Sequence, residues 1–345
     1  MSSGPSSVEM HDRRSNAVAL WLLACCALVL AMVVVGGITR LTHSGLSIVE
    51  WQPVVGAFPP LDESAWQEAF RKYQDTPQFR QVNPNMDLAG FKGIFWWEYV
   101  HRLLGRLIGA AFLLPLLWFA ARGRISRALT WKLSGIFVLG GLQGAMGWYM
   151  VQSGLVDDPR VSQYRLAAHL ALALAIYAAM LWVALDLLYK RRVDAAAGPR
   201  GLAFALAGLV FVMAISGSFV AGIRAGLAYN SFPLMNGHLV PPGMFVIDPW
   251  YLNFFNNIAT VQFDHRLLAW LLAFVVPWFW VRVRRSGASS RARLAAHLLL
   301  ATLALQIALG ISTLLLVVPL PLAAAHQAGA LLVFTAALFA AHSLR

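Results

Sequence analysis

Charged residues are scarce in this 345-residue sequence, where Asp, Glu, Lys and Arg together make up 12%. A water-soluble chain has about 25%. Hydrophobic residues make up 59% and the mean hydropathy is +0.65. This shortage of charge excludes an ordinary soluble enzyme, because polar side chains could not cover so much apolar surface. The composition therefore predicts that most of the chain lies in a lipid bilayer.

Cysteine is almost absent, since Cys25 and Cys26 are the only two and are adjacent within an apolar run. Neither a disulfide framework nor a cysteine-based metal site is expected from such a pair. The first 16 residues are polar and lack the apolar core and cleavage pattern of a signal peptide. The apolar run that follows is therefore predicted to be a retained membrane helix.

Eight apolar runs have about the length that spans a bilayer. They lie at 17–38, 95–121, 132–152, 165–189, 201–223, 257–281, 294–318 and 322–343. Because a helix is the only open-chain structure that satisfies its own backbone in lipid, the predicted fold is an all-α integral membrane protein with eight transmembrane helices. In addition, Trp66, Phe70 and Tyr73 have helical spacing in the first long loop, which predicts an amphipathic helix on the membrane surface.

The net charge of +12 is concentrated in alternate connections, which predicts membrane topology rather than nucleic-acid binding. Arginine and lysine cluster before the first run, after the second, fourth and sixth runs, and at the C-terminal end. By the positive-inside rule, both termini are predicted to be cytoplasmic.

The two halves of the sequence repeat one another. Glu98-Tyr-Val-His101-Arg102 in the second run matches Gln262-Phe-Asp-His265-Arg266 in the sixth. Gln143 and Gly147 match Gln306 and Gly310, and Ala-Ala-His occurs at 167–169 and 324–326. Four spans in each half place both halves in the membrane in the same direction. We therefore expect two pseudo-symmetric four-helix bundles, at 17–190 and 201–345, with a cytoplasmic tail at 1–16 and a cytoplasmic linker at 191–200.

Four of the nine histidines, His101, His169, His265 and His326, lie inside the even-numbered runs near one membrane depth. A single intramembrane histidine can be a hydrogen-bonded core residue, but two pairs at matching repeat positions favour a cofactor. Helix bundles bind cofactors between facing helices, and imidazole is an axial ligand of haem iron. A zinc site needs three or four protein ligands. The sequence thus predicts two haem-iron sites, His101 with His169 and His265 with His326.

The other five histidines, His11, His43, His238, His297 and His342, are predicted to be solvated. Arg102 and Arg266 follow the ligand histidines directly, and they would either pair with haem propionates or extend to the membrane interface. Arg40 and Arg224 are weaker candidates for the propionates.

The clearest difference between the repeats is Glu98, whose counterpart is the uncharged Gln262. Glu98 is either solvated at the membrane boundary or part of a reaction site, where a carboxylate takes a proton or stabilises positive charge. In the second case the other site would transfer electrons only.

Five stretches carry a resemblance to a known family: GGITRLTHSGLS at 36–47, EWQP at 50–53, FWWEYVHR at 95–102, AAH at 167–169 and QFDHR at 262–266. With these stretches, the sequence resembles the haem A synthases of the bacterial CtaA and mitochondrial Cox15 type over nearly its whole length. It lacks the outer-loop cysteine pair of Gram-positive members, so it is similar to the proteobacterial and mitochondrial branch.

The resemblance implies a role for each site residue. His265 and His326, with Arg266, would bind a haem b cofactor. His101 and His169, with Arg102, would bind the substrate, haem O, and Glu98 would be the catalytic carboxylate. The implied enzyme is an oxidoreductase that converts the C8 methyl group of haem O to a formyl group by successive hydroxylations, which gives haem A for cytochrome oxidase.

The resemblance also implies a location in the bacterial inner membrane. The implied partners are haem O synthase (protohaem farnesyltransferase) and cytochrome oxidase assembly factors, whereas the electron donor or acceptor and any homo-oligomer stay undefined. Two alternatives remain from the residues alone: a dihaem b-type electron carrier of the quinol-oxidising kind, and a haem transporter. The difference between Glu98 and Gln262 favours a reaction, since a pure carrier needs no carboxylate at one haem only.

Overall fold

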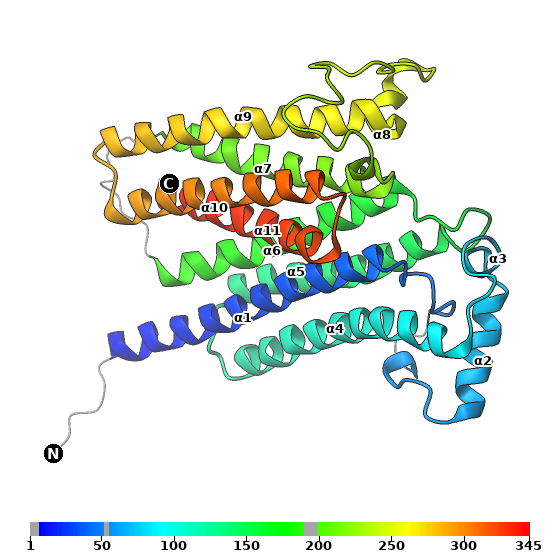
Figure 1. Ribbon diagram of the computed structural model, residues 1–345. Coiled ribbons are helices and arrows are strands. Elements are labelled where there is room, and N and C mark those ends of the chain that lie inside the picture. Colours follow the sequence, from blue (N-terminus) through cyan, green and yellow to red (C-terminus); the bar gives the residue numbers. More distant parts are fainter. Residues whose placement is uncertain (1–6, 52–54, 190–198) are drawn as a thin grey trace.

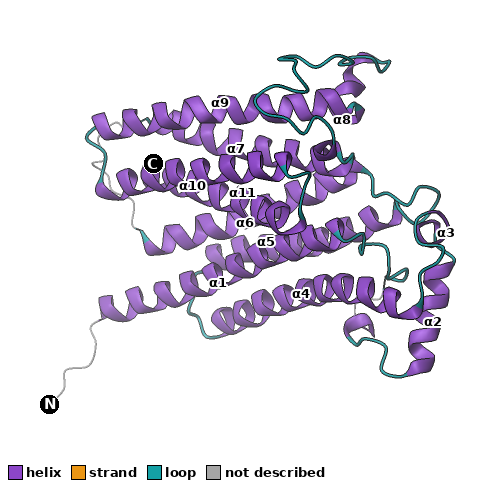
Figure 2. Cartoon of the chain, in the orientation of Figure 1, coloured by secondary structure: helices purple, strands orange, loops and turns teal. Residues whose placement is uncertain are grey.

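The computed structural model describes residues 7–51, 55–189 and 199–345. Residues 191–198 of the predicted linker at 191–200 and residues 1–6 of the predicted tail at 1–16 lie outside the described residues. The side chains of residues 7–14 also lie outside them. Apart from one isolated bridge between Met235 and His238, no described residue is in a β-strand, as Figure 2 shows. The all-α fold class is confirmed.

Eight helices in the described part of the chain have 23 or more residues. They are α1 (Ser7–Leu41), α4 (Leu88–Ala121), α5 (Arg127–Gln152), α6 (Gln163–Leu188), α7 (Arg200–Gly222), α9 (Ile258–Arg285), α10 (Ser290–Leu315) and α11 (Leu320–Ser343). The short helices are η1 (Val55–Ala57), α2 (Glu63–Gln74), α3 (Pro77–Gln81), η2 (Ala225–Leu227), η3 (Trp250–Leu252) and α8 (Asn253–Asn256).

Seven of the long helices are long and apolar enough to cross a membrane, counted over the described residues. They are all of the long helices except α5, and they make the chain an integral membrane protein. Helix α5 has the same length as α6 but is less apolar, because four glycines and Gln143 lie between its residues 140 and 147.

Several long helices begin at a side chain that caps them. Asp87 accepts a hydrogen bond from the Gly90 N–H at 2.8 Å before α4, and Asn257 accepts one from the Ala259 N–H at 2.9 Å before α9. Ser126 and Ser289 do the same for α5 and α10. Such caps satisfy N–H groups that have no partner inside the helix, so they fix where the helices start.

The long helices pack in two circuits. In the first, α1 contacts α4, α4 contacts α5, α5 contacts α6, and α6 contacts α1. In the second, α7, α9, α10 and α11 contact one another in the same order. Contacts of α6 with α7, α1 with α11, and α6 with α11 join the two circuits. Each helix therefore occupies the place of its repeat counterpart.

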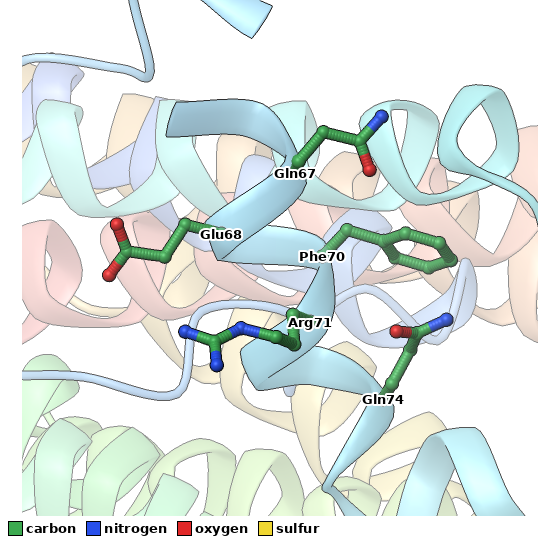
Figure 3. A pocket seen from close by; sticks show the side chains of 5 residues that line it. All are labelled: Gln67, Glu68, Phe70, Arg71 and Gln74. Carbon is green, nitrogen blue, oxygen red and sulfur yellow. The ribbon is translucent and has the colours of Figure 1, made fainter. Parts of the chain in front are cut away.

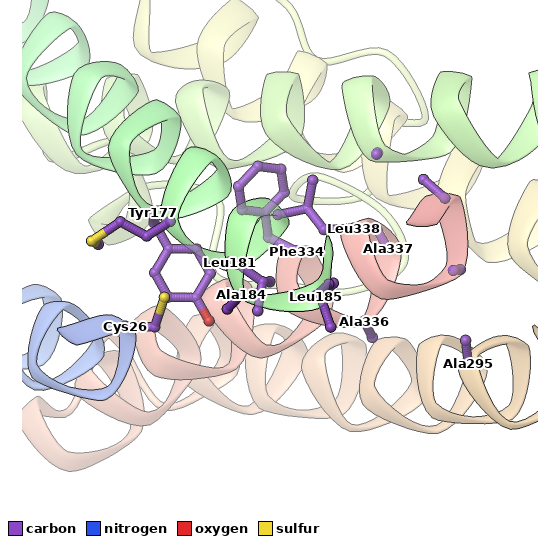
Figure 4. Close-up of a cluster of buried hydrophobic side chains, with 14 of the residues drawn as sticks. Cys26, Tyr177, Leu181, Ala184, Leu185, Ala295, Phe334, Ala336, Ala337 and Leu338 are labelled. Atoms are coloured by element: carbon purple, nitrogen blue, oxygen red, sulfur yellow. The ribbon is translucent and has the colours of Figure 1, made fainter. Parts of the chain in front are cut away.

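The junction between the circuits has an apolar core, and polar bonds cross it at several places. Tyr177 of α6 shares a hydrogen bond of 2.7 Å with Thr335 of α11, and Gln327 of α11 donates to the Val33 carbonyl of α1 at 2.8 Å. Figure 4 shows part of this core, in which Cys26 of α1 lies beside Tyr177 of α6, and residues of α11 pack against other residues of α6. Cys25 and Cys26 are both free and buried there.

The two ends of the molecule differ. In Figure 1 the start of α1 and the end of α11 lie at one end, which we call the terminal end. Helices α2, α3 and α8 and the long connections lie at the other, which we call the loop end. All four site histidines lie in the half of their helices nearer the loop end, since α4, α6, α9 and α11 all start there.

Helix α2 corrects one prediction. A helix does form at Glu63–Gln74, capped by Asp62, but Trp66 and Tyr73 are buried by the protein itself. The Trp66 ring meets Phe91 and Phe95 of α4 edge-on, with ring centres 6.4 and 4.9 Å apart. The apolar face of this helix thus packs on the start of α4, and the predicted contact with a membrane surface is wrong.

Candidate functional site

The four predicted ligand histidines fall into two pairs. His101 of α4 and His169 of α6 lie within electrostatic range of each other, and so do His265 of α9 and His326 of α11. All four rings are partly buried. Among the described residues, no group of three or more His, Cys, Asp or Glu side chains could hold a metal ion. Two imidazoles suit an iron whose other ligands come from a cofactor, and they are too few for a zinc site.

Each of these rings faces a glycine on a neighbouring helix. A Cβ atom added to these glycines would lie 2.7 to 3.3 Å from the nearest ring atom. The facing pairs are Gly36 with His101, Gly147 with His169, Gly217 with His265, and Gly310 with His326. Glycine permits this close approach because it has no side chain. Helices α1 and α5 of the first circuit and α7 and α10 of the second therefore leave room for the imidazoles in the same way.

Polar neighbours contact three of these histidines, either at the ring or at the backbone carbonyl. Ser216 shares a hydrogen bond of 2.7 Å with Nδ1 of His265, which leaves Nε2 of that ring for another partner. Gln306 donates to the backbone carbonyl of His326 at 2.9 Å, and Gln143 donates to that of His169 at 3.0 Å. Such contacts around a ligand fix its orientation. Sequence reasoning missed these roles, although the matching positions of Gln143 and Gln306 were a signal.

Some buried polar atoms at these sites have no hydrogen-bond partner in the described part of the chain. They are Oε1 of Gln143, Oε1 of Gln306 and Nδ1 of His326. Unpaired buried atoms are costly and rare. Their position beside both histidine pairs indicates sites that are completed by another group.

Glu98 is one turn nearer the loop end than His101, and its side chain is buried, with 2% of the residue exposed. Its Oε2 accepts bonds from the Ser47 N–H, the Ser47 hydroxyl and the Ile48 N–H at 2.7, 2.8 and 2.9 Å. Its Oε1 accepts two bonds from Arg102, at 2.6 and 3.1 Å. The alternative that Glu98 is solvated is therefore wrong.

Arg102 completes a clamp on the loop that follows α1. Its Nη1 donates to the Glu50 carbonyl at 2.9 Å and its Nη2 to the Ile48 carbonyl at 2.7 Å. With Glu98, it holds the backbone of residues 47–50 against α4, and we call this pair and its loop the loop clamp.

The second half has a loop clamp at the matching position, but there the side chain at 262 donates hydrogen bonds to the loop backbone, whereas Glu98 accepts them. Gln262 donates to the Ala225 and Ala228 carbonyls at 2.8 and 2.5 Å. Arg266 donates to Oε1 of Gln262 and to the Tyr229 carbonyl, at 3.1 and 2.7 Å. Arg102 and Arg266 therefore have protein partners, and their contact with haem propionates stays a prediction.

His342 corrects another prediction. It is 1% exposed, and its Nε2 lies 3.1 Å from Oδ1 of Asp186, which Arg345 also contacts. The end of α11 packs on α6 here, which buries a histidine that the sequence places at a helix end. His43 and His238 are exposed, as predicted, and the His11 side chain lies outside the described residues.

A depression of about 510 Å³ lies elsewhere, on α2. Gln67, Glu68, Phe70, Arg71 and Gln74 line it, as Figure 3 shows. These residues all belong to α2, which carries no site histidine, so the depression lies apart from the two histidine pairs.

The fold and the site define an integral membrane protein in which each of two repeated helix groups carries a pair of partly buried histidines. The model of the cytochrome oxidase assembly protein family, COX15-CtaA, matches residues 19–338, and the chain belongs to this family.

Similar proteins cover nearly the whole chain. A heme A synthase of Nitrosospira multiformis is 63% identical over 99% of this chain and 97% of its own length. The heme A synthase of Nitrosomonas eutropha is 57% identical over 99% and 98%, and that of Parvibaculum lavamentivorans is 51% identical over 98% and 97%.

Proposed function

We propose that this chain is a haem A synthase, an oxidoreductase that converts haem O to haem A for cytochrome oxidase. In the reaction, two successive hydroxylations of the C8 methyl group give a geminal diol, which loses water to leave a formyl group. The family match and the names of the relatives support this function. The observation that carries it is the asymmetry of two otherwise matched histidine sites, since Glu98 stands beside one and Gln262 beside the other.

The membrane arrangement proposed is eight transmembrane helices in two pseudo-symmetric four-helix bundles, at 17–190 and 201–345. The two circuits of contacts support it, as does the length of α5, which matches that of α6 and α10. The basic residues after α4 and α9 lie at the terminal end, which supports cytoplasmic termini in a bacterial inner membrane.

We assign haem b to His265 and His326, and the substrate haem O to His101 and His169. The haem b bound at His265 and His326 would supply one-electron redox chemistry. The ring-facing glycines, the bond between Ser216 and Nδ1 of His265, and the unpaired Nδ1 of His326 support this ligation, because an imidazole in a narrow space with a ring nitrogen free of protein partners could bind iron.

Glu98 is proposed as the catalytic carboxylate. It lies one helical turn from His101 and is shielded from solvent. A buried negative charge at this place can stabilise positive charge that develops on the substrate, and it does so more strongly than in water. Arg102 and Ser47 hold the carboxylate in one orientation, which keeps it pre-organised for that role.

The alternative of a dihaem b-type electron carrier is not supported, because the relatives are named for synthesis of haem A and because a carrier needs no carboxylate at one site only. As partners we propose the haem O synthase (protohaem farnesyltransferase), which would supply the substrate, and cytochrome oxidase assembly factors, which would use the product.

Extraction of the bound pigments tests the function directly. The full-length protein is purified from a membrane that makes haem O, and its haems are identified by mass. We expect haem B together with haem O, a hydroxylated haem O or haem A. Two equivalents of haem B and no farnesylated haem would contradict the proposal and favour the electron carrier.

A further inference from the structure

A group of basic side chains lies where the two helix circuits meet at the loop end. Arg40, in the last turn of α1, donates from Nη1 to the Ala221 carbonyl of α7 at 2.6 Å. Arg224, just after α7, donates from Nη2 to Nδ1 of His43, just after α1, at 3.3 Å. Each bond joins the first half of the chain to the second. We call Arg40, Arg224 and His43 the basic junction.

The basic junction lies close to both histidine sites. Arg40 is four residues beyond Gly36, which faces His101, and Ala221 is four residues beyond Gly217, which faces His265. Four residues are about one helical turn, or about 6 Å along the axis, on the same helix face. The bond from Arg40 to Ala221 thus connects the two helix faces that meet His101 and His265.

Positive charge in the basic junction lacks a matching carboxylate. Among the described residues, no Asp or Glu forms an ion pair with Arg40 or Arg224, and each guanidinium makes a single hydrogen bond out of five N–H donors. Asp158 is within electrostatic range of Arg224, but it pairs with Arg160 at 2.8 Å.

His43 does not add a charge. A guanidinium can only donate, so the bond from Arg224 requires an acceptor on Nδ1. Partial desolvation, together with the charges of Arg224 and Arg40, lowers the pKa of His43. Two like charges close together and partly withdrawn from water are unfavourable unless an anion joins them.

The contrast with Arg102 and Arg266 is informative. Those two arginines donate to loop carbonyls and to Glu98 or Gln262, and the one buried donor atom of either that has no partner is Nε of Arg266. Arg40 and Arg224 have open donors near both sites. Carboxylates are the anions that a haem brings, at its propionate groups, and arginine binds carboxylates with paired bonds.

We propose that Arg40 and Arg224 bind haem propionate carboxylates in a site that the two halves share. The inference rests on the haem ligation proposed above. It adds the basic junction to the propionate-binding residues, since most donors of Arg102 and Arg266 already bond to the loops. A positive group next to a propionate stabilises the reduced, less positive haem, so the basic junction raises the reduction potential of each haem whose propionate it holds.

The test uses the full-length holoprotein and spectroelectrochemical titration of its haems. Arg224→Gln, at an exposed position, and Arg40→Gln should each lower the midpoint potential of at least one haem. A tenfold change in relative affinity for the two redox states corresponds to about 59 mV for one electron. Arg40→Lys keeps the charge and should keep most of the potential. The matched control is Arg284→Gln at the terminal end, where Arg284 lies over the Trp280 ring and should not affect either haem.

The source of the carboxylate is found by repeating Arg224→Gln in His265→Ala and His101→Ala proteins, which each keep one intact histidine pair. If Arg224→Gln shifts the midpoint potential only in the protein that keeps His265, the propionate belongs to the haem at His265 and His326. If it shifts the midpoint potential in both proteins, the haems of both histidine pairs contribute a propionate. Parental potentials in both arginine variants, with the haems retained, would overturn the inference. A parent protein without any low-spin haem would instead overturn the ligation on which the inference rests.

Discussion

At the scale of single residues, the clearest difference between the repeats is whether the side chain at position 98 or 262 accepts hydrogen bonds from the loop backbone or donates to it. Glu98 accepts from the N–H groups of residues 47 and 48, whereas Gln262 donates to the carbonyls of residues 225 and 228. Each side chain therefore matches the orientation of the loop that it holds. The carboxylate at 98 has two tasks in our proposal, a loop contact and a charge beside the substrate, and an experiment has to separate them.

We predict that Glu98→Gln lowers turnover by about 10²-fold or more while haem b stays bound. Its amide oxygen can replace Oε2, but its NH₂ group would face the donors of Arg102, which costs about 1–3 kcal/mol in the loop clamp. Haem O, or the alcohol intermediate, should accumulate. The measurement is the haem composition of cells and of purified protein.

Ser47→Ala is the matched control for Glu98→Gln, because it removes one donor from the same oxygen and keeps the charge. We expect it to retain most of the turnover. Production of haem A at the parental rate by a folded Glu98→Gln protein would defeat the catalytic role. An equal loss in Ser47→Ala would trace the effect to the loop instead.

We predict that His265→Ala and His326→Ala each remove most of the low-spin haem b absorbance, because a haem iron held by these two imidazoles would lose one of its protein ligands. His342→Ala is a suitable control, since His342 is also an imidazole of α11 but contacts Asp186 rather than a glycine. It should keep the spectrum of the parent. Full bis-histidine spectra in both site variants would refute the assignment.

At the scale of helices, the sequence predicted what depends on side-chain pattern. Apolar runs indicated the long helices, and the repeated His-Arg motif indicated the two histidine pairs. The loop clamps could not be predicted, because Arg102 and Arg266 bond to backbone carbonyls, whose direction no side-chain pattern records. The packing of α2 was missed for a similar reason, since an apolar face fits lipid and protein equally well.

The ring-facing glycines show the same limit. Gly147 and Gly310 are part of a repeated motif in the sequence. Because glycine is common in membrane helices, the motif does not predict that each glycine contacts a histidine ring, and only the structure shows this contact. Replacing one of these glycines by alanine should have an effect only when the histidine ring that it faces is bound to iron. Without a ligand the imidazole can rotate away from a new methyl group, whereas an axial bond fixes it.

We therefore predict that Gly310→Ala leaves the fold intact and weakens haem b binding, because its Cβ would lie 2.7 Å from Cε1 of His326. Gly208→Ala in α7 is the control, since nothing lies within 4 Å of that position. Thermal unfolding and haem titration of both proteins make the comparison. Equal haem affinity in Gly310→Ala and the parent would show that the contact does not constrain the ligated ring.

At the scale of the whole molecule, the proposed function depends on the two halves having the same direction in the membrane. Only then do His101, His169, His265 and His326 share one depth, and only then can the basic junction reach both sites. Helix α5 decides this, because among the long helices in the described part of the chain it alone has a composition that falls short of a membrane span. Its 26 residues measure about 39 Å, enough to cross a hydrocarbon core of about 30 Å.

Reporter fusions test whether α5 crosses. We predict a cytoplasmic signal for fusions after Arg124 and Arg285, at the terminal end, and after Arg192, which lies outside the described residues. Fusions near Asp157 and Asn236, at the loop end, should give an outside signal. If α5 did not cross, Asp157 would report the same side as Arg124, and every later position would change sides. The basic residues after α9 would then be outside, against the positive-inside rule. An outside signal at Arg285 would therefore refute both the eight-helix arrangement and the common depth of the four histidines.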